Sequence, residues 1–511
     1  MDKFTSFLWK TFYGAFILAF APGILFILFR SRTFMSPVWL PFITVVIVLP
    51  LLLMAWRVCG RVAPLFSDRT HRLLLIGFMA VSAILQFAIG NRLRIVPMWD
   101  VEAIFDGAIM WVLTGSLDVP TFYHGTYLRY FAMFSNQWGG VFLFRCVFWV
   151  YNLVGGRDFH FAALAWNVGM VQAMVFALHC AARRLYGPRA GLFVLFFLCI
   201  FLPFHFFGAV YYTDTLSLPF VAIAFALYLR GKDAEKLITK LLLFAACGLA
   251  VAVGAAIKFT VAIVFIAIVI DLLLAEDAGG FLRRLLCAAT AALVAVIIFG
   301  SFNIYMRGII GPEMTNRHRI PRAHWLMMGL QGYGRYSWDD FNFTMSIPDL
   351  PDRQSQTAAV TRARLGSLGV AGLGRLYAGK FAINFGDGTY EMHRILGQNP
   401  VHDTGLHEIV LTRGRHFNSY AHFATGVTTG MLLLMLLAAA GKLLKPQALD
   451  INPVPWLAFF GLALVLTFWE SGGRLAMNFF PLLVVGGMAG LSMLEPWVDN
   501  ATLISKEKYS E

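Results

Sequence analysis

Long apolar runs recur along the whole length of this chain and constrain its fold more than any other feature. A helix needs about 20 mostly apolar residues to cross the hydrocarbon core of a bilayer. Hydrophobic residues make up 59% of the 511-residue chain and charged residues only 14%, which excludes a soluble domain with a single core. The sequence therefore predicts an all-α polytopic membrane protein.

About twelve transmembrane helices are expected, and the charges between them predict their orientation. Basic segments such as "AARRLYGPR" and "RGKDAEKLITK" fall on one side of the membrane if the apolar stretch 137–154 does not cross it. That side is cytoplasmic by the positive-inside rule. We therefore interpret 137–154, which carries Arg145, as a helix on the outer surface. The expected spans are residues 11–29, 38–56, 73–90, 159–181, 189–208, 214–230, 238–257, 259–275, 284–303, 418–440, 454–469 and 475–493.

With both termini inside, two long segments face the extracytoplasmic side. The larger one contains 13 Lys and Arg and 9 Asp and Glu, and it is rich in aromatic residues. We expect it to fold because these aromatic side chains need burial: Trp325, Tyr336, Trp338, Phe381, Phe385 and Tyr390. The expected regions are N-terminal transmembrane helices (1–90), a first extracytoplasmic loop with surface helices (91–158), central transmembrane helices (159–303), the large extracytoplasmic loop (304–417), and C-terminal transmembrane helices with a short cytoplasmic tail (418–511).

Three carboxylates follow directly on the third apolar run, in the stretch "MWDVEAIFDGAIMWVL". Its apolar residues have helical spacing, which predicts an amphipathic helix on the outer leaflet. Asp100 would precede or cap the first turn, Glu102 would lie within it, and Asp106 would lie on a later turn. A single Asp in this position is more often a helix N-cap than a catalyst. A chemical role for Asp100 therefore requires other outward polar groups to converge on it.

Such groups occur at the outer ends of other spans. Tyr212 and Asp214 lie where one span begins, although Asp214 is also a natural N-cap. Lys258 lies between two apolar runs with almost no loop, where it either snorkels to the headgroups or serves a function. Glu470 and Arg474 are four residues apart, so a local ion pair is the alternative to a functional role. Together, Lys258 and Arg474 are placed to hold an anionic headgroup.

The motifs "MWDVEAIFDGA", "ARRLYG", "VYYTDTLS", "GLAVAVGAAIKFTVAI" and "FWESGGRLAMNFFPLL" follow one another in this order. In order and topology they resemble the membrane glycosyltransferases of the GT-C superfamily, specifically the bacterial protein O-mannosyltransferase and aminoarabinose-transferase type, over roughly residues 90–495. The chain departs from that pattern at Leu475, where an aromatic residue is common, and in its Asp-x-Glu motif. It also has three helices before the first outer loop, where many relatives have one.

The resemblance implies a GT-C fold and inverting transfer of a sugar from a polyprenyl-phosphate-linked donor to a hydroxyl on a cell-envelope glycan, lipid or protein. It places the general base at Asp100, which takes the proton of the acceptor hydroxyl. The leaving lipid phosphate needs positive charge, which Lys258 and Arg474 supply. The further substrate-binding residues expected are Glu102, Tyr212, Asp214 and Glu470. The active site is expected on the extracytoplasmic face of the cell membrane.

No cofactor is predicted, and the sequence does not determine a metal requirement. The six cysteines have no zinc spacing, and His402, Asp403, His407 and Glu408 form the nearest approach to a metal cluster. The net charge of +13 does not indicate nucleic acid, because most basic residues lie between the apolar runs. The alternative functions are a transporter or flippase for a lipid-linked saccharide, and a non-catalytic scaffold for envelope assembly.

Overall fold

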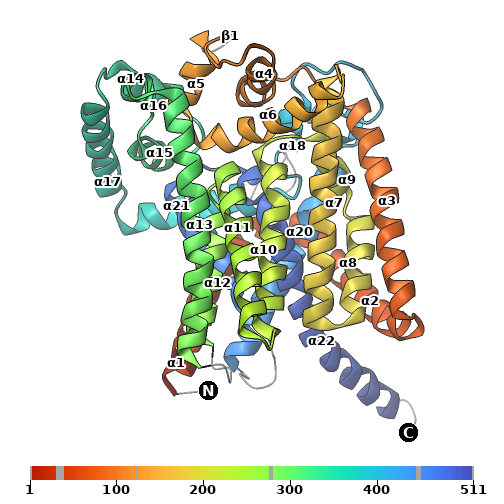
Figure 1. Ribbon diagram of the computed structural model, residues 1–511. Coiled ribbons are helices and arrows are strands. Elements are labelled where there is room, and N and C mark those ends of the chain that lie inside the picture. The colour runs from red at the N-terminus through yellow and green to blue at the C-terminus, as the bar shows by residue number, and fades with distance from the viewer. Residues whose placement is uncertain (1–2, 30–39, 122–124, 276–279, 445–450, 509–511) are drawn as a thin grey trace.

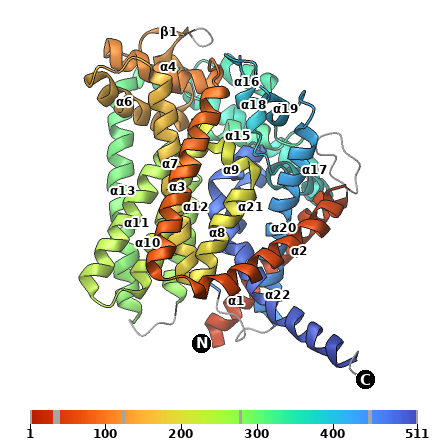
Figure 2. The ribbon, with the colours of Figure 1, turned by 90° about the vertical axis from the view of Figure 1, so that its right-hand side faces the viewer.

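The computed structural model describes residues 3–29, 40–121, 125–275, 280–444 and 451–508, and its regular structure is almost entirely helical. Long helices run side by side through the molecule, with both termini at one end (Figure 1). The short helices of the two predicted outer segments gather at the opposite end (Figures 1 and 2). This arrangement agrees with the predicted topology, in which both termini lie on one side and both long segments on the other.

The long helices belong to three parts of the chain. The N-terminal part contains α1 (Lys3–Phe29), α2 (Leu40–Val62) and α3 (Asp68–Arg92). The central part contains α7 (Phe159–Tyr186), α8 (Pro188–Ile200), α9 (Leu202–Phe206), α10 (Thr213–Asp233), α11 (Leu237–Ile257), α12 (Val261–Leu274) and α13 (Phe281–Ile310). The C-terminal part contains α20 (Phe417–Leu444), α21 (Val454–Phe468) and α22 (Phe480–Lys508). Short 3₁₀ helices are η2 (Ala63–Leu65), η3 (Ser135–Gln137), η4 (Phe207–Ala209) and η5 (Gly473–Phe479).

All twelve predicted spans fall on helices in the described part of the chain, outside which residues 38 and 39 of the second span lie, but the helices are not equally long. Within the described residues, nine helices are long and apolar enough to cross a membrane, and α8 with the segment 202–209 is a helix pair bent by 72°, which is either a broken tenth span or a re-entrant loop. The remaining two, α12 and α21, have only 14 and 15 residues. At 1.5 Å per residue, a 14-residue helix spans about 21 Å, less than the roughly 30 Å hydrocarbon core. Lys258 lies just before the start of α12, and Glu470 lies just after the end of α21. Both residues were predicted to form the site.

The first outer segment forms a cap of short elements over the helix ends. It contains α4 (Trp99–Thr114), the two-residue strands β1 (Pro120–Thr121) and β2 (Gly125–Thr126), α5 (Tyr127–Met133) and α6 (Trp138–Leu153). Gly115 ends α4 in the left-handed conformation, with φ of 75°, which glycine adopts without strain. In Figure 1, α6 lies across the top of the long helices, as expected for the surface helix predicted at 137–154.

The second outer segment contains α14 (Pro312–His318), α15 (Arg322–Gly329), α16 (Trp338–Ser346), α17 (Leu350–Phe385), α18 (Met392–Leu396) and α19 (His407–Val410). Its helix α17 is interrupted at Gly369 and then packs against α1, where the Tyr377 hydroxyl donates to the Ala19 carbonyl at 2.7 Å. Phe381 packs edge-on against Phe20 at 5.2 Å between ring centroids. The end of this predicted loop is therefore part of the helical core.

The predicted burial of the loop aromatics is confirmed for only some of them. Phe381, Phe385 and Tyr390 are buried, and Trp325 is partly buried. The prediction is wrong for Trp338, which is 65% exposed, and Tyr336 is only partly buried, with 37% of its surface exposed. These two rings pack edge-to-face on each other at 5.3 Å. Mutual ring packing removes part of their apolar surface from water without placing them in the core.

Candidate active site

Asp100 lies inside the first turn of α4, so it is not the helix N-cap. The cap residue is Met98, whose side chain makes no capping bond. Asp100 instead receives two hydrogen bonds from tyrosines. The Tyr130 hydroxyl donates to Oδ1 at 2.6 Å, and the Tyr212 hydroxyl donates to Oδ2 at 3.2 Å. The carboxylate is therefore oriented by side chains from α5 and from the start of α10.

Tyr130 is a partner that sequence reasoning missed. Its side chain is fully buried, and burial, with the Asp100 charge adding to it, raises the pKa of the phenol well above its usual value. The phenol therefore remains protonated and donates to Asp100 at any physiological pH. The sequence signal was faint, because "TYLRYFAMF" reads as another amphipathic surface helix.

Trp99, which directly precedes Asp100 in the sequence, is more exposed than its neighbours at the site. Its side chain is 53% exposed, and its backbone has a φ of 52°, in the left-handed region. A bulky residue adopts this conformation only when its surroundings impose it, and such strained positions gather at functional sites. The shelter around Asp100 comes instead from Tyr130 and Tyr212, both of which are buried.

Tyr212 links the carboxylate to the basic side of the site. Gln137, at the end of η3, donates to the Tyr212 hydroxyl at 2.9 Å, which fixes the phenol as a donor to Asp100. The Arg474 guanidinium carbon lies 5.4 Å from the centre of the same Tyr212 ring, a cation–π distance. One side chain therefore touches both the proposed base and a proposed phosphate ligand.

Lys258 and Arg474 converge as predicted, but they converge on Asp214. The Lys258 ammonium forms an ion pair with Asp214 Oδ1, and Arg474 reaches Asp214 Oδ2 at 3.4 Å. Lys258 also donates to the Arg474 carbonyl at 3.3 Å. Two cations at a partly buried position need a counter-ion, and Asp214, whose side chain is 1% exposed, supplies it. The N-cap alternative for Asp214 is therefore wrong, since Tyr212 caps α10.

Glu470 lies beside this cluster without joining it by an ion pair in the described part of the chain. The local Glu470–Arg474 alternative is therefore not what forms, since Arg474 pairs with Asp214. Burial raises the pKa of Glu470, Arg474 opposes that rise, and the charges of Asp100 and Glu391 add to it. Glu470 is thus within electrostatic range of the proposed base.

The turn that carries Glu470 is held by Lys380, which the sequence did not single out. Its buried ammonium donates to the carbonyls of Gly329 and Thr467, both at 2.9 Å, and to that of Trp469. The last two carbonyls lie at the C-terminal end of α21, where backbone acceptors lack helical partners and favour a cation. Lys380 therefore stabilises the C-terminal end of α21. Glu470 follows this end directly and is positioned by it.

Glu102 makes no ion pair with this cluster within the described residues, and its hydrogen-bond partner is Tyr127. Its side chain is 7% exposed and accepts a hydrogen bond from the Tyr127 hydroxyl at 2.8 Å. Burial raises the pKa of Glu102, and the Tyr127 bond opposes that rise. Asp106, one turn further, has its pKa raised to about 7 by burial, with the Glu102 charge adding to it. Glu102 is therefore bound by Tyr127 of α5 and not by the other predicted site residues, although its charge acts on Tyr130, the donor to Asp100.

Tyr336 extends the site on the side of the large outer segment. Burial raises the pKa of its phenol, and the charges of Asp100 and Glu470 add to that rise, so the ring lies within range of both carboxylates. Together with the more exposed Trp338, it presents aromatic surface beside the site. Aromatic faces of this kind can stack on sugars. The sequence predicted burial for both rings and missed this placement.

No group of three or more His, Cys, Asp or Glu side chains is placed to hold a metal ion within the residues that the structure describes. The residues around His402 therefore do not form a metal cluster. The six cysteines are free thiols.

Comparisons with known proteins place the chain among membrane proteins. Three solved structures are similar: ArnT from Cupriavidus metallidurans bound to undecaprenyl phosphate, the same enzyme in the apo state, and the oligosaccharyltransferase AglB from Archaeoglobus fulgidus in complex with an inhibitory peptide and a dolichol-phosphate.

The similarity to these structures is distant. The sequence identities are 15%, 16% and 11%, and the TM-scores are 0.37, 0.36 and 0.41. The matches cover 84%, 82% and 85% of this chain, and 80%, 78% and 52% of the three others. TM-scores below 0.5 are too low to establish a common fold. No curated protein matches the sequence. Residues 4–493 match the model of one family, described as conserved hypothetical integral membrane protein, and the chain therefore belongs to that family of integral membrane proteins.

Proposed function

We propose that this protein is a glycosyltransferase that moves a sugar from a polyprenyl-phosphate-linked donor to a hydroxyl acceptor at the extracytoplasmic face of the membrane. The observation that carries the proposal is the position of Tyr212. Its hydroxyl binds Asp100 and its ring contacts Arg474, so a carboxylate and a basic cluster lie on two sides of one side chain. The order of the sequence motifs and their resemblance to GT-C enzymes support the same function.

In the proposed reaction Asp100 acts as the general base. An acceptor hydroxyl is a weak nucleophile, and a positioned carboxylate takes its proton as the oxygen attacks the anomeric carbon. The Tyr212 contact with Oδ2, at 3.2 Å, is longer than the Tyr130 contact with Oδ1, at 2.6 Å. Oδ2 is therefore the oxygen we assign to the incoming hydroxyl. A new carbon–oxygen bond to the acceptor forms as the bond to the phosphate breaks, with inversion at the anomeric carbon.

The leaving phosphate requires positive charge and no proton. Lys258, Arg474 and Asp214 together carry one net positive charge, because Asp214 neutralises one of the two cations. The Arg474 side chain is 27% exposed and that of Lys258 11%, so Arg474 is the group we assign to direct phosphate contact. A guanidinium also binds two phosphate oxygens at once. Lys258, which is more buried than Arg474, then adds to the positive potential at the leaving phosphate without contacting it directly.

The experiment that tests this function is a comparison of envelope lipids, glycans and glycoproteins by mass spectrometry in cells with and without the protein. The proposal predicts one sugar modification that disappears with the protein, together with accumulation of the lipid-linked donor. A transporter or flippase would leave the sugar attached to its lipid and change only its distribution. A scaffold protein would change the assembly of the envelope, and its loss would not remove one specific glycosidic linkage.

The geometry also bears on these alternatives. Transporter sites typically lie near the bilayer midplane, between related halves. Here the polar groups lie at the ends of helices: Asp100 in the first turn of α4, Asp214 in the first turn of α10 and Lys258 at the C-terminal end of α11. A scaffold requires no linkage of Asp100 with Lys258 and Arg474, yet Tyr212 and Asp214 connect all three. Both observations favour the enzyme over either alternative.

A further inference from the structure

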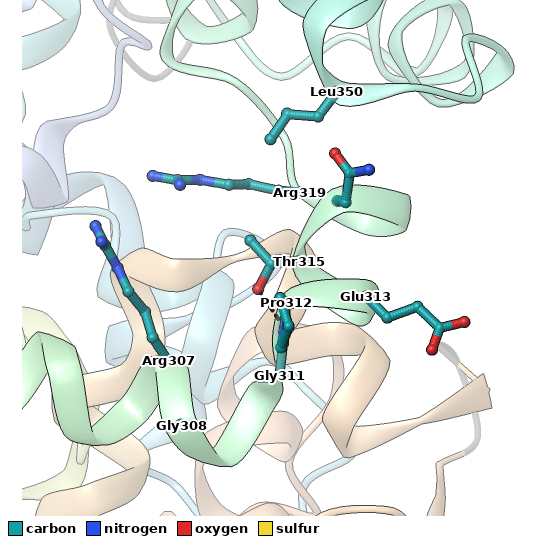
Figure 3. Close-up of a pocket in the computed structure, with 9 residues that line it drawn as sticks. Arg307, Gly308, Gly311, Pro312, Glu313, Thr315, Arg319 and Leu350 are labelled. Atoms are coloured by element: carbon teal, nitrogen blue, oxygen red, sulfur yellow. Dashed lines mark hydrogen bonds between the residues drawn. The ribbon is translucent and has the colours of Figure 1, made fainter.

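A cavity lined by apolar surface and by two arginines lies at the outer end of α13, apart from the cluster around Asp100. It has a volume of about 790 Å³, and its lining comes from α13, α14 and the start of α17: Arg307, Gly308, Gly311, Pro312, Glu313, Thr315, Asn316, Arg319 and Leu350 (Figure 3). On α13, just before the cavity, the side chains of Ile304 and Tyr305 are 73% and 45% exposed. The cavity therefore opens where the exposed apolar surface of this membrane-type helix ends.

Two arginines of this cavity have their charged ends on the same side. Figure 3 shows the guanidinium groups of Arg307 and Arg319 extending in one direction, while the Glu313 carboxylate points the other way. Within the described residues, no hydrogen bond or ion pair occupies either guanidinium. Burial lowers the pKa of Arg319, and the charges of Arg307 and Arg322 lower it further, so three cations lie close together.

The main chain that carries this cluster is fixed from inside. Arg353 is 1% exposed and donates to the carbonyls of Arg319 at 2.6 Å and Arg317 at 2.9 Å. It also donates to the carbonyls of Ile347 and Pro348. The main chain at Arg319 is therefore held in place, so that its side chain stays near Arg307 and Arg322 although like charges repel. An anion bound between them would offset that repulsion.

We propose that this cavity binds the phosphate-bearing headgroup of a lipid in the membrane leaflet at this end of the molecule. Guanidinium groups bind phosphate oxygens in a bidentate manner, and two of them reach the same side of the cavity. The cavity joins the exposed apolar surface of α13, which a lipid's acyl chains would cover. An arginine at the outer end of a membrane helix also runs against the positive-inside trend. The site is separate from Lys258 and Arg474 and does not depend on the proposed reaction.

The test uses the full-length protein in detergent micelles and measures binding of short-chain phosphatidic acid by calorimetry, with short-chain phosphatidylcholine and inorganic phosphate as comparison ligands. The double variant Arg307→Gln/Arg319→Gln removes the two facing charges. The matched control Arg362→Gln/Arg413→Gln removes two exposed charges elsewhere on the same outer segment. A second variant, Gly308→Leu, places an apolar side chain in the cavity lining without changing charge, and a Cβ atom added at Gly308 meets no atom within 4 Å.

The proposal predicts that phosphatidic acid binds the wild type and the control equally, and that the Arg307→Gln/Arg319→Gln variant raises its Kd about tenfold or more, as expected for loss of charge-assisted hydrogen bonds. Gly308→Leu should weaken binding comparably while the thermal unfolding temperature stays unchanged. Equal loss in the Arg362→Gln/Arg413→Gln control would reduce the effect to general surface charge and overturn the site. Inorganic phosphate binding as tightly as phosphatidic acid would overturn the assignment to a lipid. Unchanged binding in both cavity variants would overturn the proposal as a whole.

Discussion

Replacing Asp214 by Asn tests the arrangement of charges at the centre of the proposed site. Asp214 is almost fully buried and pairs with both Lys258 and Arg474. Opposite charges 3.4 Å apart, the Asp214–Arg474 distance, attract by about 5 kcal/mol at an effective dielectric constant of about 20. Asp214→Asn keeps the size of the side chain and removes its charge. The two cations then repel each other with no counter-ion between them.

Removing one partner of a buried ion pair typically costs roughly 3–5 kcal/mol, because the remaining charge is left uncompensated. We therefore expect Asp214→Asn to lower the free energy of unfolding by that amount. Adding Lys258→Met removes the uncompensated ammonium while keeping an unbranched chain, so the double variant should recover a large part of the loss. The interaction between the two substitutions is then read from a double-mutant cycle.

The assay is reversible unfolding by denaturant in mixed micelles, followed by tryptophan fluorescence. Asp68→Asn is the control, because the Asp68 side chain is 78% exposed and pairs with Arg183 at the opposite end of the helices. Exposed pairs contribute at most about 1 kcal/mol. The reasoning is refuted if Asp214→Asn is as stable as the Asp68→Asn control, or if Lys258→Met makes Asp214→Asn less stable still.

Three further predictions concern the donor, the topology and the pH dependence. Arg474→Met and Lys258→Met should raise the apparent KM for the donor, lower kcat, or both, and unchanged kinetics in both variants would remove the phosphate site. Cysteines placed at 186 and 234, in a background without native cysteines, should be shielded from membrane-impermeant thiol reagents in intact cells. A cysteine placed at 350 should be labelled. Labelling at 186 would contradict the predicted orientation of the helices in the membrane. Since the pKa of Asp106 is raised from 3.8 to about 7 in the folded protein, the stability it contributes is full below about pH 4 and is lost as the pH rises through 7. Asp106→Asn should flatten that dependence in unfolding measurements, and an unaltered pH profile would argue against a buried, protonated Asp106.

The helical architecture was predictable from the sequence because long apolar runs leave a membrane chain few alternatives. The ends of α12 and α21 were also predicted to within two residues, by the expected spans 259–275 and 454–469. The side chains that bind these helix ends were not predictable, because they are distant in sequence. One such partner is Lys380, which binds the last carbonyls of α21.

The candidate site was predictable in part, because the orientation of the helices follows from the positions of the charges between them. Orientation alone places Asp100, Lys258 and Arg474 at one end of the helices, and the structure brings them to a common neighbourhood through Tyr212. Which side chains pair there could not be predicted. Asp214 as a shared counter-ion and Tyr130 as a donor to Asp100 both follow from tertiary packing, which local patterns do not encode.

The central claim is that Asp100 takes the proton of the acceptor, and turnover of Asp100→Asn in proteoliposomes tests it most directly. The donor and acceptor are those identified by the comparison of envelope lipids, glycans and glycoproteins, and Asp118→Asn, an exposed carboxylate on the same outer segment, is the matched control. Asn keeps the shape of the side chain but does not accept the proton. We predict that turnover falls by about 10² to 10⁴-fold, while donor binding and the control remain at wild-type levels. Turnover of Asp100→Asn at the wild-type rate would contradict the mechanism.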